Sequence, residues 1–285
     1  MTKYEVILER FLTVESIQIH HDQSIMNRVD RMAWQEISGN WVLVPARPLG
    51  IVHFLGGAFI AAAPNVTYRS LLEYLGNRGY VVVATPFINT LDHFAIATQV
   101  LDNFDQALDY LRSQVLRRRY LPIYGIGHSM GCKLHLLIGS LFSVQRAGNI
   151  LIACNNFPAR RSIPLVEQLS PVLDVEFTPT PAATNQLVAE KYQIRRNFLI
   201  QFARDDLDQT GAIARILKER FPNLVSTQTL AGNHFTPINQ DLAWEPGEAF
   251  SPIDAIGQWF GQTVSQDLRQ LKRSLSLWLE PTSPP

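Results

Sequence analysis

Cysteine is scarce in this sequence, with Cys132 and Cys154 the only two among 285 residues and no pair at C-x-x-C spacing. This scarcity argues against a disulfide framework and against a structural zinc site, since both need more thiols. Each cysteine stands among apolar residues, where a free thiol behaves as a small hydrophobic side chain. We expect both to be buried; a reactive thiol at Cys132 is the alternative.

An excess of either charge is also lacking, because 25 basic and 25 acidic residues give a formal net charge of zero. The one basic cluster, residues 117–119, is interpreted as a solvated helix end. No run of apolar residues reaches the length of a membrane span. Residues 1–10 carry charges where a signal peptide needs an apolar core. We therefore expect a cytoplasmic protein without a nucleic acid or integral-membrane partner.

Cofactor and metal motifs are missing as well. No G-x-G-x-x-G or Walker pattern follows a strand-like run, so no nucleotide cofactor is implied. His93 and His135 lie in helix-like segments without partners at metal-ligand spacing. His53 lies within a strand and is expected to be buried and hydrogen-bonded. The sequence predicts no cofactor and no metal.

What the sequence does contain is an alternation of short apolar runs with amphipathic stretches. From residue 34 to 45 the pattern indicates strands with a turn at 38–40, and from residue 50 strands and helices alternate. Such alternation predicts an α/β fold with a mostly parallel sheet and helices on both faces. We expect a single domain over 1–285 with its core at about 34–279. The expected strands are 50–55, 80–84, the run before residue 128, 149–153, 198–202 and 224–230, and the expected helices are 68–76, 91–112, the run after residue 129, 211–220 and 254–279.

Residues 155–196 interrupt this rhythm with five prolines. The segment follows a strand, where α/β proteins often place a lid over a binding site. An ordinary surface excursion has the same composition. Both interpretations stay open at this point.

The most informative motif is Gly127-His128-Ser129-Met130-Gly131, a G-x-S-x-G sequence between a strand-like and a helix-like run. A serine at such a sharp strand-to-helix turn adopts a strained backbone and projects its oxygen into a cleft. The flanking glycines are expected because a side chain there would collide with neighbouring backbone. The next amide lies at a helix N-terminus, which favours an anion. One turn can thus supply a nucleophile and half of an oxyanion hole. For His128 we expect a packing or hydrogen-bonding role.

Serine is a weak nucleophile that needs a base, and the base needs an acid to orient it. With this motif the partners follow in the chain order serine, acid, histidine. His234 is the last histidine of the chain and follows the 224–230 strand, so it is the predicted base. A structural histidine is the alternative.

Three aspartates follow the 198–202 strand and compete for the role of the acid. We favour Asp206, a few residues beyond the strand end, with Asp205 second and Asp208 third. For the two that do not pair with the histidine, helix capping is the expected role, since aspartate is favoured at N-caps.

A second oxyanion donor is expected in the glycine-containing loop after the 50–55 strand. Gly57 or Ala58 is predicted to pair with the amide of Met130, a plain turn being the alternative. Phe59, Met130 and Phe157 are candidates to line an apolar acyl pocket, which suggests a lipid-like or aromatic substrate. Apolar residues near a cleft are, however, more often simply core.

These residues resemble the α/β-hydrolase superfamily from about residue 34 to the end of the last helix. The 127–131 turn, Gly56-Gly57, Asp206 and His234 match its nucleophile elbow, oxyanion loop, acid and base. WVLVP (41–45), VHFLGGAF (52–59) and YGIGHSMGC (124–132) are similar to a poorly characterised hydrolase-like family of cyanobacteria and plastids. The chain departs from the superfamily in having Leu-Gly rather than His-Gly in the oxyanion loop. It also lacks Asp-x-Arg-Gly-x-Gly after the next strand.

Together the motifs predict a serine hydrolase that cleaves a small carboxylic ester or thioester through an acyl-enzyme intermediate. Fold alone does not establish activity, so a non-catalytic binding protein on the same scaffold is the rival hypothesis. A lyase or a cofactor-free oxygenase that uses the same triad is a third hypothesis.

Overall fold

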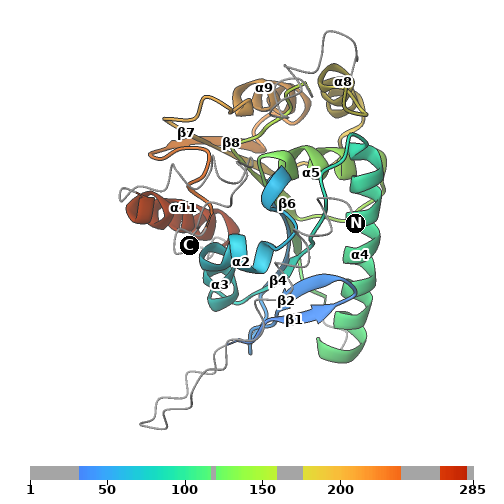
Figure 1. Ribbon diagram of the computed structural model, residues 1–285, viewed down its shortest axis with the longest axis vertical. Helices are drawn as coiled ribbons and strands as arrows, with labels where there is room; N and C mark the ends of the chain where they lie inside the picture. Colours follow the sequence, from blue (N-terminus) through green and yellow to red (C-terminus); the bar gives the residue numbers. More distant parts are fainter. Residues whose placement is uncertain (1–31, 117–119, 159–175, 239–263, 281–285) are drawn as a thin grey trace, which may run out of the picture. The chain divides into compact units, whose positions relative to one another are not determined.

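The computed structural model describes residues 32–116, 120–158, 176–238 and 264–280 (Figure 1). The described residues all belong to one compact unit, Met32–Pro285. The basic cluster at 117–119 and the first part of the expected last helix, 254–263, lie outside the described residues.

Eight strands of the described segments form one mixed sheet. Their order is β1-β2-β4-β3-β5-β6-β7-β8. β1 and β2 form an antiparallel hairpin, β2 pairs antiparallel with β4, and all other neighbours are parallel. The bounds are β1 Gln35–Ile37, β2 Asn40–Leu43, β3 Gly50–Leu55, β4 Tyr80–Ala84, β5 Ile123–His128, β6 Gly148–Ile152, β7 Asn197–Phe202 and β8 Val225–Leu230.

Helices cover both faces of this sheet (Figure 1). On one face, α3 and α11 pack together against the strands. On the other, α4, α5, α8 and α9 form a row in which each helix contacts the next. The bounds are η2 Ala58–Ile60, α2 Pro64–Thr67, α3 Arg69–Asn77, α4 His93–Tyr110, its π-helical continuation η3 Leu111–Val115, α5 Met130–Leu141, α8 Pro181–Lys191, α9 Thr210–Arg220 and α11 Val264–Leu279.

Burial explains why the central strands are apolar along their whole length. Every residue of β3, β4, β5 and β6 is buried, as expected for parallel strands covered by helices on both faces. In β3, Val52 and Phe54 face α3 and α11, whereas Ile51 and Leu55 pack on the opposite face. The edge strand β8 differs, since its four central residues are polar and exposed. The predicted α/β fold with a mostly parallel sheet is confirmed.

The expected strands, and the helices 68–76, 91–112 and 211–220, agree with the observed elements to within one or two residues. The last helix agrees at its C-terminal end, whereas the short helices η2 and α2 were not predicted. The described part of the segment 155–196 contains the helix α8, which was not predicted either. Thr180 caps this helix by accepting the N–H of Ala183, and Pro181 occupies its first turn, a common N-terminal combination. α8 packs between α5 and α9 and connects β6 to β7. The remainder, 159–175, lies outside the described residues, and a lid role for it stays a prediction.

Among the helices of the described segments, none combines the length and hydropathy that a bilayer-spanning helix needs.

Candidate active site

The nucleophile elbow joins β5 to α5. Ser129 has φ 54° and ψ −118°, a region that non-glycine residues occupy only when the surroundings hold them there. A Cβ atom on Gly131 would collide with the carbonyl group of Leu55, and one on Gly127 would lie 2.7 Å from the amide nitrogen of Cys132. The expected reason for both glycines is therefore confirmed: the elbow packs too tightly against β3 and its own helix for side chains.

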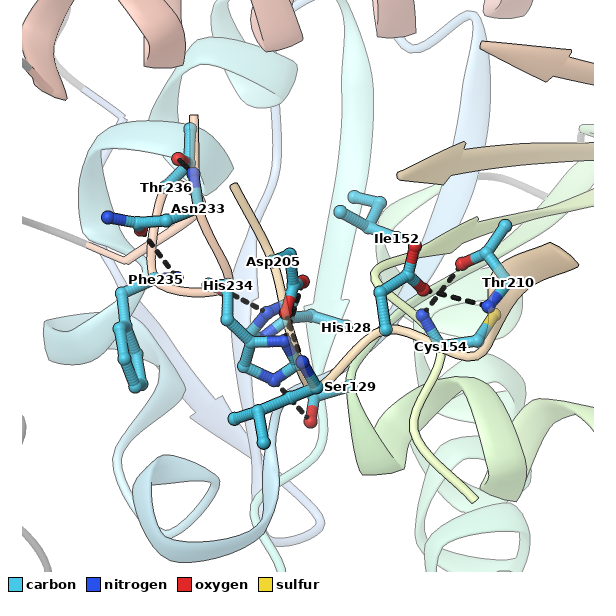
Figure 2. A network of polar contacts seen from close by, with 12 residues as sticks. His128, Ser129, Ile152, Cys154, Asp205, Thr210, Asn233, His234, Phe235 and Thr236 are labelled. Carbon is cyan, nitrogen blue, oxygen red and sulfur yellow. Dashed lines mark hydrogen bonds and ion pairs between the residues drawn. The ribbon is translucent and has the colours of Figure 1, made fainter. Parts of the chain in front are cut away.

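Three side chains from different loops meet at the carboxyl edge of the sheet (Figure 2). Ser129 Oγ lies 2.9 Å from Nε2 of His234, and Nδ1 of His234 lies 2.8 Å from Oδ2 of Asp205. An ionised carboxylate only accepts hydrogen bonds, so Nδ1 carries the proton and Nε2 is left as the acceptor for the serine hydroxyl. This is the tautomer in which a histidine can remove a proton from serine.

Asp205, and not Asp206, contacts the histidine, so the choice of Asp206 as its partner is wrong. The side chain of Asp205 is fully buried against His234, whereas Asp206 is exposed. The second carboxylate oxygen of Asp205 accepts the N–H of Leu207 at 2.9 Å, which fixes the carboxylate in the turn after β7. Adjacent turn residues point in different directions, and their spacing from the strand end does not determine which one turns inward.

Asp208 is not the N-cap residue expected for an unused aspartate, because it precedes Gln209, the N-cap of α9, but its side chain binds the first turn of that helix. Its Oδ1 accepts the N–H of Thr210, the first residue of α9, at 2.8 Å. Burial raises the pKa of this carboxyl, and the nearby Asp205 carboxylate raises it further.

The loop that carries His234 is held by its own hydrogen bonds (Figure 2). Asn233 donates its N–H to Oγ1 of Thr236 at 2.9 Å, and its Oδ1 accepts the N–H of Phe235 at 3.0 Å. Gly232 enters this turn with φ 123°, a conformation that favours glycine. His234 therefore lies on a closed turn and is 7% exposed.

The two amides proposed for the second oxyanion donor differ in the structure. Gly57 donates its N–H to Oη of Tyr68 at 2.7 Å, so this amide already has a partner. Among the described residues, neither the N–H of Ala58 nor that of Met130 has an acceptor. Gly57 nevertheless borders Ser129, because a Cβ atom on Gly57 would lie 3.4 Å from Cβ of Ser129. Of the two candidates, only Ala58 has an amide N–H without an acceptor among the described residues.

The three residues expected to line an acyl pocket are placed less uniformly. Met130 is buried and packs in the core with Leu55 and Leu134. Phe157 lies in the loop after β6 and is partly buried, and its N–H donates to Oδ1 of Asn155. Phe59 lies in η2, and its side chain is outside what the structure describes. Their role toward a substrate stays a prediction.

The remaining predictions from the sequence concern buried polar groups. Both cysteines are buried, as expected. His53 is buried and hydrogen-bonded as predicted, with Nε2 3.1 Å from Oγ1 of Thr85. His128 is also hydrogen-bonded, to Tyr68 and to the backbone of His234. The participation of Tyr68 was missed, because nothing in its local sequence marks it.

The strand order, the helical layers and the elbow define the class of structure as the α/β-hydrolase fold, and solved structures agree. An esterase from Pyrococcus furiosus, Pf2001, is 13% identical with a TM-score of 0.56, covering 92% of this chain and 97% of its own. S-formylglutathione hydrolase (FrmB) from Staphylococcus aureus is 14% identical with a TM-score of 0.53, covering 90% of this chain and 100% of its own. FphF, a fluorophosphonate-binding serine hydrolase from Staphylococcus aureus, is 14% identical with a TM-score of 0.52, covering 85% and 92%.

Within that class, residues 33–281 match the family described as "Protein of unknown function (DUF1350)", and the chain belongs to this family. None of the curated proteins matches the sequence. The narrower similarity to a cyanobacterial and plastid family stays a prediction.

Proposed function

We propose that this protein is a serine hydrolase that cleaves a small carboxylic ester or thioester through an acyl-enzyme intermediate. The observation that carries the proposal is the chain of two hydrogen bonds from Ser129 Oγ through His234 to Asp205. A buried histidine in the correct tautomer beside a strained serine is the arrangement that activates a hydroxyl group. The names of two similar structures, an esterase and a fluorophosphonate-binding serine hydrolase, also support this chemistry.

In this mechanism Ser129 Oγ attacks the carbonyl carbon while Nε2 of His234 takes its proton. The same proton then passes to the leaving alcohol or thiol, and a water molecule repeats the two steps to release the acid. Asp205 keeps the ring in its reactive tautomer and stabilises the imidazolium ion. No cofactor is needed in these steps.

The oxyanion of the tetrahedral intermediate would accept hydrogen bonds from the amides of Met130 and Ala58. Met130 is the first residue of α5, where the helix dipole adds a favourable positive end. Removal of one such donor typically reduces kcat by about 10²–10³. We propose Ala58 rather than Gly57 because the Gly57 amide is bound to Tyr68.

A fluorophosphonate probe tests the proposal directly, with the adduct mapped by mass spectrometry. We expect labelling on Ser129 in the wild type and none in Ser129→Ala, and loss of labelling in His234→Ala. A panel of p-nitrophenyl esters and acyl thioesters of increasing chain length then identifies the leaving group and acyl preference. A folded wild type that does not label would contradict the proposal and favour a binding protein. Labelling without hydrolysis of any ester or thioester would favour a lyase or oxygenase.

The acid is tested by a matched pair of neighbours. Asp205→Asn should lower kcat by about 10²–10⁴, because the amide can hold the histidine in the wrong tautomer. Asp206→Asn changes the same chemical group one residue away on the exposed side of the turn and should stay within about twofold. Equal effects of the two substitutions, measured as kcat on one substrate, would refute the assignment of Asp205.

A further inference from the structure

A directed chain of hydrogen bonds lies beside the triad and is not part of it. Tyr68 Oη accepts the N–H of Gly57 at 2.7 Å and lies 2.8 Å from Nδ1 of His128. Nε2 of the same histidine lies 2.9 Å from the backbone carbonyl oxygen of His234. Tyr68 is completely buried and His128 is 1% exposed, so no solvent competes for these groups.

The direction of every bond in this chain follows from the chemistry of its ends. A carbonyl oxygen only accepts, so Nε2 of His128 carries the proton. Burial and the neighbouring His234 lower the pKa of His128 well below its usual value, and the ring is neutral. Nδ1 therefore has a lone pair and accepts the hydroxyl proton of Tyr68. The tyrosine oxygen is then free to accept the N–H of Gly57, and each donor in the chain of hydrogen bonds has one acceptor.

We infer that Tyr68 and His128 are positioning residues that tie the oxyanion loop and the base loop to the nucleophile elbow. His128 directly precedes Ser129 in the chain, and it donates a hydrogen bond to the backbone carbonyl group of His234. This one bond therefore links the segment that contains the proposed nucleophile to the segment that contains the proposed base. Tyr68, which directly precedes α3, holds Gly57, the residue before the proposed oxyanion donor Ala58. The inference rests on the proposed function, because a positioning role requires a reaction to position.

The packing around this chain leaves little freedom for an alternative arrangement. A Cβ atom on Gly57 would lie 3.3 Å from both His128 Nδ1 and Tyr68 Oη. The tyrosine ring also packs edge-on against Phe54 of β3, with centroids 4.7 Å apart. Loss of the hydroxyl would leave the Gly57 amide and the His128 nitrogen buried without partners. A shift of one ångström between reacting groups can reduce the rate about 100-fold.

Substitutions that remove the chain can be matched with one that removes an equivalent bond elsewhere. Tyr68→Phe deletes only the hydroxyl group. Tyr192→Phe is the control, because Tyr192 is also completely buried and its hydroxyl also makes two hydrogen bonds, to Asn149 and Asn197 in the core. Both variants should lose similar stability in urea unfolding. Tyr68→Phe should reduce kcat about tenfold or more with KM within about threefold, whereas Tyr192→Phe should keep kcat within about twofold.

The histidine is tested by rescue. In His128→Gln a side-chain oxygen can accept from Tyr68 and a side-chain N–H can donate to the His234 carbonyl, whereas His128→Leu can do neither. We expect His128→Gln to retain most of kcat and of the probe-labelling rate, and His128→Leu to lose at least as much as Tyr68→Phe. The double variant Tyr68→Phe/His128→Leu should be no slower than His128→Leu alone, because both changes break one unit. A kcat in Tyr68→Phe no lower than in Tyr192→Phe would overturn the inference.

A spectroscopic measurement separates this inference from the proposed function. In nitrogen-15 spectra of labelled histidine, the ring signals that vanish in His128→Gln should be those of an Nε2–H tautomer. An Nδ1–H tautomer at that residue would overturn the inference even if the enzyme is active. If Ser129 does not label in the wild type, the proposed function fails. In that case two results together support the structural link: an Nε2–H tautomer of His128, and a change in the His234 signals in Tyr68→Phe that Tyr192→Phe does not show. If these results are absent, the link is refuted.

Discussion

Acidification from pH 7 to pH 5 should destabilise this protein severely, because the described part of the chain buries four histidines in their neutral form. His53, His93, His128 and His135 are each at most 3% exposed. Burial lowers the pKa of His93 and of His135 to about 3. It places the pKa values of His53 and His128 well below 6.5. In the unfolded chain all four bind protons below about pH 6.5.

The sign of the effect follows from proton binding in the two states. As the pH falls through 6.5 the unfolded chain takes up protons that the folded protein does not, so the free energy of unfolding decreases. His93 and His135, whose pKa values lie at about 3, each lower the free energy of unfolding by about 2 kcal/mol at pH 5 and by about 0.2 kcal/mol at pH 7. Together these two histidines give a loss of about 4 kcal/mol between pH 7 and pH 5, a large part of the stability of a typical domain. His53 and His128 act in the same direction, whereas Asp105 and Asp208, whose pKa values burial raises, act in the opposite direction.

Urea unfolding followed by tryptophan fluorescence at pH 7, 6, 5.5 and 5 measures this loss. His93→Phe is the informative variant, because both ring nitrogens of His93 lack a partner among the described residues and its ring stacks on Phe177 at 4.2 Å. The substitution should reduce the loss between pH 7 and pH 5 by about 2 kcal/mol. It should also raise stability at pH 7 by about 1 kcal/mol, since two unpartnered polar atoms disappear. Phe94→Leu, at the exposed neighbouring position, should keep the full pH dependence. A wild-type loss below about 2 kcal/mol would refute the reasoning.

Two further predictions concern the helix that follows the nucleophile. Gly131→Ala should destabilise the protein by about 3 kcal/mol or more in a urea titration, because the new methyl group would collide with the Leu55 carbonyl group. Gly211→Ala is the control, because a Cβ atom there meets nothing within 4 Å. It should be neutral or slightly stabilising in the same titration. Lys133 is 2% exposed, its Nζ donates to the Pro179 carbonyl, and burial lowers its pKa to about 8. Because the unfolded chain keeps this proton to higher pH, Lys133 should contribute a rise in the free energy of unfolding between pH 8 and 9.5 of up to about 1.4 kcal/mol per pH unit, which the Cys132 thiol, whose pKa burial raises, opposes. Lys133→Met should abolish that rise, and a rise of equal size in the variant would assign it to other groups.

Much of the fold could be predicted because burial is visible in the residue pattern. β3, β4, β5 and β6 are apolar along their whole length since helices cover both faces of the sheet. The elbow was also predictable, because the spacing of Gly127 and Gly131 is visible in the chain. The steric reason for Gly127 lies within a few residues, whereas the reason for Gly131 is the distant Leu55 carbonyl group. The pairing of His234 with Ser129 followed from chain order. The helix α8 was missed, because its capping signal at Thr180 and Pro181 lies in a proline-rich segment that resembles a loop.

The sequence by itself determined which strands are buried, where the chain turns at Ser129 and which histidine reaches that serine. Only the tertiary structure decided that Asp205 rather than Asp206 meets that histidine, and that the Gly57 amide is bound to Tyr68. Apolar periodicity and the spacing of Gly127 and Gly131 can be read along the chain, even though the contact that requires Gly131 is with the distant Leu55. Which groups form a hydrogen bond depends instead on where individual atoms point once separate loops have come together. The loops of His128 and His234, for example, are more than 100 residues apart in the sequence.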